Sequence, residues 1–253
     1  MSGDTKLIRL IEELAANGWP AYIQQTLGAW RLRANMDVTK RANSVYTSGP
    51  FPEHGEWLDI VEDFYRRRSL SPCFHISETS PAELDGILDS AGYRKDSACF
   101  TMVASCGEVM DRSVESDLFT SEFAGEASSE WIHAFIRLEG YSPGRYEGYV
   151  HIFSMIGPKK AFVILREHGE LIALGTAVVE RGWAGLSNIV VAPEHRGKGA
   201  AIALLRSLAD WSLRNGADQL YLQVLKDNSP ALSLYRKMGF TPLYEYHYRL
   251  LDT

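Results

Sequence analysis

The sequence predicts an α/β protein in which a mixed, strongly twisted central sheet is flanked by helices. Three observations support this fold class. Short apolar segments of strand length alternate with amphipathic segments of helix length along the 253 residues. A strand-like segment that ends near residue 191 runs through a glycine-containing loop directly into a long helix. The order of elements in the first half is also similar to that in the second half, so two halves of related architecture are expected.

In the first half, apolar residues at helical spacing predict a helix over 5–16. Ser80, Pro81 and Glu83 have the spacing of a capping box with proline at the first helical position, which predicts the start of another helix that ends at Gly92. The other expected elements of this half are strands at 29–34 and 41–46, a helix at 56–67, and strands at 73–76 and 99–104.

A polar stretch at 105–116 is the predicted linker between a domain over 1–116 and a domain over 117–253. After it, a helix at 128–139 leads into an aromatic, glycine-rich segment at 140–149, which is expected to be a loop. The remaining expected elements are strands at 161–166, 172–179 and 184–191, a helix at 199–215, a strand at 219–225, a short helix capped by Ser229 and running from Pro230 to Gly239, and a strand at 245–251.

Short stretches of identical letters recur near the ends of the two halves. T-S-P-A at 79–82 corresponds to N-S-P-A at 228–231, and a glycine–aromatic pair at 92–93 corresponds to another at 239–240. Each stretch follows a strand and precedes the last strand of its half. The pattern indicates a divergent internal duplication.

The composition favours a soluble, cytoplasmic globular protein with a hydrophobic core. Apolar residues make up 45% of the chain and charged residues 23%. No stretch approaches the ~20 apolar residues of a membrane span, and the first residues lack a secretory signal pattern. Three cysteines without C-x-x-C spacing indicate neither a disulfide framework nor a zinc site, so no metal is expected.

The charge distribution bears on possible partners. The net charge of −6 disfavours nucleic acid, because phosphate binding needs a basic surface. Residues 1–116 carry 12 Lys+Arg against 17 Asp+Glu, whereas residues 117–253 carry 14 against 15. An acidic half beside a nearly balanced one favours a cationic small-molecule partner, with ordinary solubility as the alternative explanation. A monomer or a homodimer is expected.

The loop between the strand ending at 191 and the long helix is the clearest chemical feature. Gly197 and Gly199 lack a Cβ, so the backbone can turn sharply and approach a ligand closely. The first amides of the following helix have no intrahelical acceptor and lie at the positive end of the dipole. These features predict an anion site suited to a pyrophosphate, with Arg196 and Lys198 adding charge. Neither a Walker A loop nor a dinucleotide fingerprint is present, since Ile202 stands where a third glycine would be required.

Two motifs resemble those of the GNAT N-acetyltransferase superfamily. R-G-K-G-A-A at 196–201, preceded by V-A-P at 191–193, is similar to the R/Q-x-x-G-x-G/A motif of that superfamily. N-S-P-A-L-S-L-Y-R-K-M-G-F at 228–240 is similar to N-x-x-A-x-x-L-Y-x-x-x-G-F. The resemblance covers residues 117–253. It implies the α+β GNAT fold and transfer of an acetyl group from acetyl-CoA to an amine through a tetrahedral intermediate.

The first half lacks both motifs. Leu88 stands where the second half has Tyr235, and Thr79 stands where it has Asn228. The resemblance therefore implies a two-part bacterial GNAT protein with tandem GNAT-like domains. In it a degenerate N-terminal half does not bind the coenzyme and only the C-terminal half keeps the cofactor loop.

The resemblance also implies roles for individual residues. Loop amides would hold the pyrophosphate, beside Arg196: those of Gly197, Lys198, Gly199, Ala200 and Ala201. The strand backbone would pair with the pantetheine arm at Ile189, Val190 and Val191, with the Ile189 N–H polarising the thioester carbonyl. Asn228 would contact the coenzyme and Tyr235 would protonate the departing thiolate. This agrees with general chemistry, since amine attack on a thioester needs an oxyanion donor and an acid, and a phenol of pKa ~10 can donate its proton.

The identity of the general base is left open by the sequence. No carboxylate lies on the strand at 186–188, where Ser187 or Asn188 could order a water that removes the proton. Glu139 and Glu147 are the alternatives.

The segment 139–149 is the predicted acceptor site, with an irregular loop packed by its own aromatics as the alternative. It combines flat polar-tipped rings with carboxylates, a mixture that suits a polyhydroxylated or cationic molecule. Its candidate substrate-binding residues are Glu139, Tyr141, Arg145, Tyr146, Glu147 and Tyr149. Tyr244, Tyr246 and His247 are expected to line the same cleft.

An aminoglycoside-type antibiotic, acetylated in the course of resistance, is the acceptor that these features favour. An amino acid, a polyamine or a protein N-terminus is the alternative acceptor. A non-catalytic acyl-CoA-binding regulatory protein is the alternative from another functional class, and the presence of both Asn228 and Tyr235 argues against it.

Overall fold

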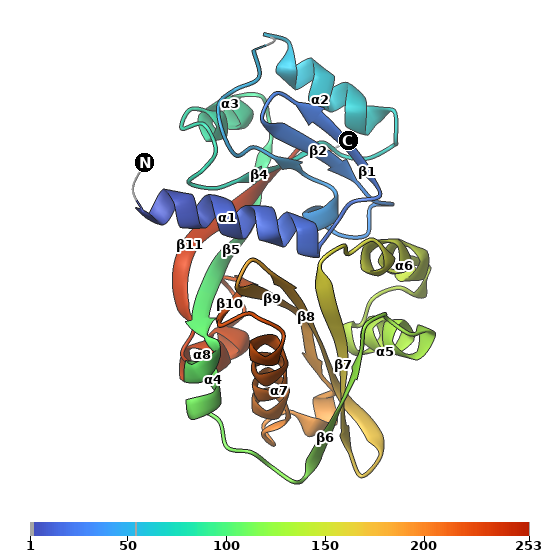
Figure 1. Cartoon of the computed structure of the whole chain (residues 1–253). Helices are drawn as coiled ribbons and strands as arrows, with labels where there is room; N and C mark the ends of the chain where they lie inside the picture. Colours follow the sequence, from blue (N-terminus) through green and yellow to red (C-terminus); the bar gives the residue numbers. More distant parts are fainter. Residues whose placement is uncertain (1–2, 54, 253) are drawn as a thin grey trace. The chain divides into compact units, whose positions relative to one another are not determined.

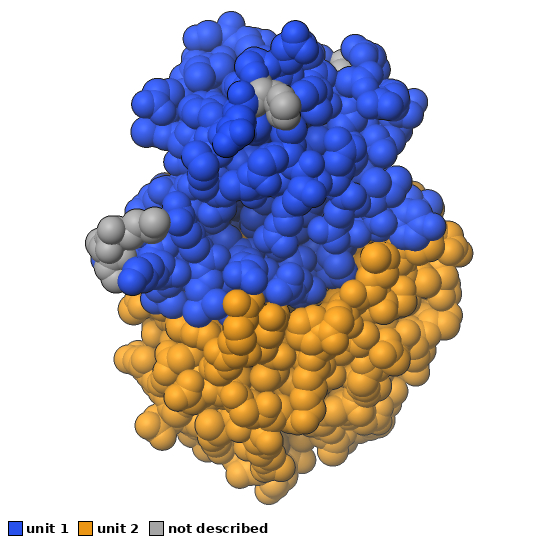
Figure 2. Space-filling model, turned by 45° about the horizontal axis from the view of Figure 1, so that its top comes forward, with its two compact units in different colours: residues 1–100, 244–253 blue, residues 101–243 orange. Residues whose placement is uncertain are grey.

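The structure is a computed structural model that describes residues 3–53 and 55–252 (Figure 1). Its contacts divide the chain into two compact units, coloured separately in Figure 2. Unit 1 comprises 1–100 and 244–253, and unit 2 comprises 101–243. The contacts thus group 101–116 with unit 2, while the division of the sequence into domains at 116/117 stays a prediction. None of the helices in the described part of the chain is long and apolar enough to cross a membrane.

Unit 1 is built from both ends of the chain. Its sheet includes β4 (Cys73–Ile76), which pairs in parallel with β3 and in antiparallel register with β11 (Thr241–Leu250), so the last strand of the chain completes the sheet of the first unit. Its other elements are α1 (Gly3–Gly18), β1 (Ile23–Leu27), β2 (Trp30–Ala34), the 3-10 turn η1 (Lys40–Ala42), β3 (Val45–Tyr46), α2 (Trp57–Arg66), α3 (Leu84–Ser90) and the first part of β5 (Arg94–Ser105).

The two faces of the unit 1 sheet differ in character. Alternate residues of a strand point to opposite faces, so β2 sends Trp30 and Leu32 to one side and Arg31 and Arg33 to the other. The first side is the apolar core, in which the Trp30 ring contacts that of Phe74 edge-on at 6.3 Å between centroids. The second side is lined by arginine and aromatic side chains.

Two expectations for unit 1 are wrong. Only 45–46 of the strand expected at 41–46 form a strand, β3, and 41–42 belong to the turn η1, because the Thr39 hydroxyl accepts a hydrogen bond from Ala42 N at 3.3 Å and caps a helical turn. The capping box at Ser80 does not form, because the Ser80 hydroxyl accepts from Ser77 N at 3.1 Å instead. Helix α3 therefore begins only at Leu84.

Unit 2 has a sheet in the order β10-β9-β8-β7-β6, in which β9 and β10 are parallel and the other neighbours antiparallel. Its elements are α4 (Cys106–Asp111), β6 (Phe119–Ala124), α5 (Ser129–Glu139), the 3-10 turn η2 (Pro143–Arg145), α6 (Tyr146–Ser154), β7 (Lys159–Glu167), β8 (Glu170–Glu180), β9 (Trp183–Val191), the 3-10 turn η3 (Pro193–His195), α7 (Ala200–Arg214), β10 (Gln219–Leu225) and α8 (Ser229–Lys237). Helices α5 and α7 lie on opposite faces. Phe162 and Val163 are successive residues of β7 and point to opposite faces of the sheet. Trp131 of α5 contacts Phe162 on one face. Gly175 pairs with Val163, and a Cβ added to Gly175 would lie 2.9 Å from Leu208 of α7 on the other face.

The core elements of unit 2 are confirmed, but three local expectations are wrong. The supposed linker contains α4, whose first turn Ser105 caps by accepting from Glu108 N at 3.1 Å. The supposed loop at 140–149 is largely helical, as η2 and the start of α6. Helix α8 is capped by Asn228 and not by Ser229, since the Asn228 Oδ1 accepts from Ala231 N at 3.2 Å.

The repeated letters correspond to the same local structure in both units. A glycine in left-handed conformation follows α3 at φ +87° and α8 at φ +94°. The amide after it bonds back into the helix, from Tyr93 N to Leu88 O in unit 1 and from Phe240 N to Tyr235 O in unit 2, each at 2.9 Å. Leu88 and Tyr235 therefore occupy equivalent positions, which supports the internal duplication.

Candidate active site

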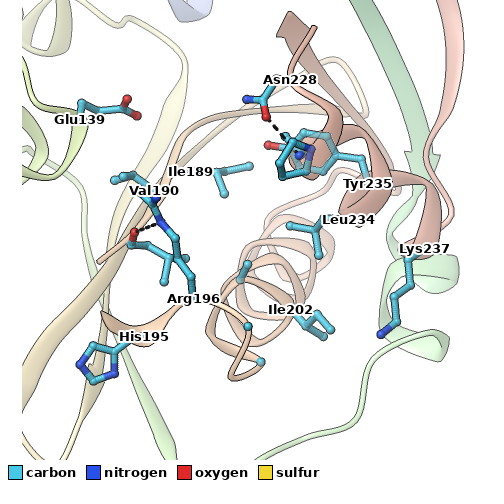
Figure 3. Close-up of a pocket in the computed structure, with 16 residues that line it drawn as sticks. Glu139, Ile189, Val190, His195, Arg196, Ile202, Asn228, Leu234, Tyr235 and Lys237 are labelled. Atoms are coloured by element: carbon cyan, nitrogen blue, oxygen red, sulfur yellow. Dashed lines mark hydrogen bonds between the residues drawn. The ribbon is translucent and has the colours of Figure 1, made fainter. Parts of the chain in front are cut away.

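A pocket of about 620 Å³ lies in unit 2 between the end of β9, the loop before α7, and α8 (Figure 3). Its lining combines the two motif regions of the sequence with the last residue of α5. The lining residues are Glu139, Ile189, Val190, Val191, His195, Arg196, Gly197, Gly199, Ala201, Ile202, Asn228, Pro230, Ala231, Leu234, Tyr235 and Lys237.

The pocket opens because β9 and β10 separate. Their pairing register ends at Leu186 and Leu222, although both strands continue. Directly after this point β9 has a bulge, in which Asn188 and Ile189 lie opposite the single residue Gly175 of β8. The strand edge that follows the bulge therefore faces the pocket, and within the described residues no strand pairs with it on the β10 side.

Asn188 holds the bulge in place. Its backbone is left-handed, with φ +55°, and its Nδ2 donates to Thr176 Oγ1 at 3.0 Å. Thr176 is itself buried. Ser187 and Asn188 are not among the pocket-lining residues, so a catalytic role for either through an ordered water stays a prediction.

The loop before α7 has the geometry of an anion site. Gly197 and Gly199 have φ +74° and +91°, and Gly199 is the N-cap of α7 without a side-chain cap bond. A Cβ at either glycine would meet no protein atom within 4 Å, so the space in front of the helix amides is open. Arg196 Nε donates to Val191 O at 3.2 Å and ties the loop to β9.

Cationic side chains contribute to the pocket. Arg196 and Lys237 line it, and the N-terminus of α7 adds its partial positive charge. The combination suits an anion of high charge density. Of the predicted loop residues, Lys198 and Ala200 do not line the pocket, while their neighbours do.

Tyr235 lies at the other end of the pocket, on α8. Its side chain is 8% exposed, and its hydroxyl makes no hydrogen bond to another described residue. Burial raises the pKa of this phenol to about 12, and the negative charge of Glu139 acts in the same direction. The phenol therefore stays protonated over the physiological range and can donate its proton. The Phe240 ring, 5.8 Å away between centroids, packs against it.

Glu139 is the one carboxylate among the pocket-lining residues. In Figure 3 it lies across Ile189 from Tyr235, at the end of α5. Although the side chain is exposed at the pocket mouth, the surrounding protein raises the pKa of its carboxyl by desolvation, an effect that Arg196 partly offsets. The raised pKa makes this carboxyl a better proton acceptor than an ordinary glutamate.

The other predicted acceptor residues do not line this pocket. Tyr149 is buried, with its ring 5.1 Å from that of Phe135, and it stacks on Tyr141. The Arg145 guanidinium lies 4.8 Å from the Tyr141 ring centre. Tyr146 stacks on His133 at 4.5 Å. Glu147 is exposed on α6. These contacts match the alternative of a segment packed by its own aromatics, and a role in acceptor binding stays a prediction.

The three C-terminal candidates belong to unit 1. His247 Nε2 lies 2.8 Å from Asp85 Oδ1, and the Tyr246 ring stacks on His75 at 4.6 Å between centroids. Tyr244 is buried. None of the three is among the residues that line the pocket of unit 2.

Sequence reasoning missed several lining residues. Pro230, Leu234 and Lys237 are spaced four and three residues apart on α8, as expected for one face of a helix. This periodicity was the signal that could have found them. His195 had no such signal, because its position in the pocket depends on η3.

Comparisons with known proteins agree with this geometry. A family model described as "Acetyltransferase (GNAT) family" matches residues 126–240, and one described as "Probable histone acetyltransferase Rv0428c C-terminal" matches residues 5–139. The chain is 50% identical over 243 residues to "Uncharacterized N-acetyltransferase YobR" of Bacillus subtilis, covering 96% of this chain and 98% of that protein.

Two further similarities are more distant. A streptothricin acetyltransferase of Streptomyces lavendulae is 39% identical over 84 residues, which are 32% of this chain and 44% of that protein. A solved tandem GNAT protein from the clavulanic acid biosynthesis pathway superposes with a TM-score of 0.68 at 12% identity, covering 95% of this chain and 87% of that one. The fold, the motifs and the full-length relative together place the chain in the GNAT family of N-acetyltransferases, as a tandem protein with a degenerate N-terminal half.

Proposed function

We propose that the protein acetylates a primary amine of a small, polar, cationic acceptor of the aminoglycoside type, with acetyl-CoA as the donor. The observation that carries the proposal is the pocket of unit 2, which joins an open, cationic anion site at the start of α7 to a protonated phenol on α8. Such a pocket combines two functions that the reaction needs, which are recognition of a pyrophosphate and protonation of a thiolate.

The residues present fit acetyl-CoA, which supplies the acetyl group as a thioester. The amides at Gly197, Gly199 and Ala201, with the Arg196 guanidinium, would bind the pyrophosphate. The unpaired edge of β9 from Ile189 would bind the amide groups of the pantetheine arm in the manner of an added strand. Apolar side chains between these sites, Ile202 and Leu234 among them, would cover its methylene groups.

Three residues would carry out the transfer. The Ile189 N–H would donate a hydrogen bond to the thioester carbonyl oxygen, where negative charge develops as the amine attacks. Glu139 would take the proton that the attacking amine loses. The Tyr235 hydroxyl would give its proton to the departing thiolate, so that the thiol is released uncharged.

The acceptor class rests on weaker support. GNAT acetyltransferases act on small-molecule or peptide amines, and the match to a streptothricin acetyltransferase favours a small molecule. The Glu139 carboxylate would attract an ammonium group before deprotonating it. Amino acids, polyamines and protein N-termini are the competing acceptors.

Thiol release from acetyl-CoA, followed with a panel of amines, tests the proposal. The panel contains an aminoglycoside, streptothricin, spermidine, an amino acid and a peptide with a free N-terminus. We expect the highest kcat/KM with one of the two antibiotics. Turnover of the peptide alone would replace the small-molecule acceptor by a protein N-terminus. Tight binding of acetyl-CoA without turnover of any amine would contradict the enzymatic role and favour a binding protein.

Glu139→Gln is expected to lower kcat by about 100-fold, in the range of a lost general base. The carboxylate acts in its ionised form, so wild-type activity falls as the pH drops through its raised pKa. The variant should lose this acidic limb of the pH profile. Glu170→Gln is the matched control, since that carboxylate is exposed, outside the pocket and given no role in the reaction. An unchanged acidic limb in Glu139→Gln would exclude Glu139 as the base.

A further inference from the structure

Arg33 of unit 1 is a charged side chain that is buried without a polar partner. It is 1% exposed, and its Nε, Nη1 and Nη2 atoms make no hydrogen bond to any residue that the structure describes. The Tyr46 ring centroid lies 4.4 Å from its guanidinium carbon, a cation–π contact. A buried, unpaired charge strongly destabilises a folded protein, so its retention calls for a partner.

Strand register places Arg33 on one polar face of the sheet. Arg31 pairs with Tyr46, Tyr46 with His75, and His75 with Tyr248, so these four residues form a row across four strands. Arg33 is two residues from Arg31 and therefore points to the same side. We call these five residues the arginine–aromatic face. It lies on the side of the sheet opposite the apolar core.

The arginine–aromatic face holds excess positive charge. Arg31 is close enough to Arg33 to repel it, and burial together with this repulsion lowers the pKa of Arg33. The nearby carboxylate of Glu12 accepts a hydrogen bond through Oε2 from Thr79 Oγ1 at 2.5 Å and interacts with Arg9 and Arg31, while its Oε1 bonds to no described residue. Within the described ranges 3–53 and 55–252, no carboxylate bonds to Arg33.

His75 adds a second unpaired polar atom to this face. Its ring is stacked between Tyr46, at 4.7 Å, and Tyr246, at 4.6 Å between centroids, and its Nε2 makes no hydrogen bond to a described residue. Burial lowers the pKa of His75 to about 3, so the ring is neutral near pH 7 and adds no charge. A ligand here would meet a neutral imidazole nitrogen and the Arg33 guanidinium.

We propose that Arg33 anchors a binding site in unit 1 for a small organic carboxylate. The guanidinium fork matches both oxygens of a carboxylate. A carboxylate carries the single negative charge that balances the buried Arg33 guanidinium, whereas a phosphate dianion carries one charge more.

Solvent reaches the strand beside this site. Gln24 of β1 lies opposite Arg33 in the antiparallel register, so its side chain is on the same face, and it is exposed. The site shares no residue with the pocket of unit 2.

Calorimetric titration of the whole chain tests the site with three small probe molecules. Benzoate carries a carboxylate on a flat ring, benzamide is its neutral analogue, and inorganic phosphate is the alternative anion. We expect benzoate to bind wild type, with benzamide and phosphate binding at least 10-fold more weakly. Arg33→Met should weaken benzoate about 10- to 100-fold, the loss of charge-assisted hydrogen bonds. Arg66→Met is the control, because Arg66 is exposed and pairs with Asp63.

Thermal melting provides a second readout, which distinguishes a ligand-binding arginine from a purely structural one. Methionine removes an unpaired buried charge and keeps much of the volume, so Arg33→Met without ligand should melt at or above the wild-type temperature. A lower melting temperature together with no benzoate binding to wild type would mean that ordered water satisfies Arg33, and it would overturn the proposal. Benzoate binding that survives Arg33→Met, or phosphate binding as tight as benzoate, would overturn it as well.

Discussion

Tyr235→Phe is expected to lower kcat by about 100-fold or more while the KM for acetyl-CoA changes little. The phenol's proton acts only as the thiolate departs, whereas the ring that packs against Phe240 at 5.8 Å is kept in the variant. Steady-state kinetics with the best amine of the panel measures both constants. Because the pKa of Tyr235 is raised to about 12, the wild-type rate should show no loss from ionisation of this group below about pH 10.

Tyr93→Phe is the matched control for this experiment. Tyr93 is also a largely buried phenol, but it lies in unit 1 and donates its hydroxyl proton to Glu62 at 3.0 Å. We expect a change in melting temperature at most and a wild-type kcat. Wild-type turnover by Tyr235→Phe would contradict the acid role and leave Tyr235 as a packing residue.

Gly199→Ala should weaken acetyl-CoA binding about 10- to 100-fold. The added methyl group would project into the open space in front of the α7 amides, where the pyrophosphate is proposed to bind. The new alanine would also be held at φ +91°, a backbone conformation that costs about 1 kcal/mol of stability for an L-amino acid. Titration calorimetry with acetyl-CoA measures the first effect and thermal melting the second.

Gly216→Ala separates these two effects. Gly216 follows the other end of α7, has φ +92°, and likewise has no protein atom within 4 Å of an added Cβ. It should lose about the same stability as Gly199→Ala, since the backbone strain is the same, and keep wild-type affinity for acetyl-CoA. Equal affinities of the two variants would show that the loop does not hold the pyrophosphate.

The sequence predicted those parts of the pocket that local chemistry determines. The glycines at 197 and 199 and the helix after them specify a turn and a helix start within about eight residues, and the structure has both. The second motif likewise predicted a short helix with its tyrosine toward the pocket. Its capping residue was misassigned by one position, because Asn228 and Ser229 are both good N-caps.

Features that depend on partners far along the chain could not be predicted. The bulge at Asn188 requires Thr176 as hydrogen-bond acceptor and the close approach of α7 at Gly175, and no local pattern specifies either. Composition alone does not distinguish ligand-binding aromatics from packing ones. The segment at 139–149 has the residues of a polar site, yet Tyr149 is buried among other rings and only Glu139 lines the pocket.

The pairing of β11 with β4 has a consequence for synthesis on the ribosome. Residues 73–76 emerge long before the strand at 241–250 that pairs with them through His247 and Tyr248. The sheet of unit 1 therefore stays incomplete, with an uncovered edge, while the more than 160 residues between these two strands are translated. A stalled or truncated product that stops before β11 would expose that edge to other chains.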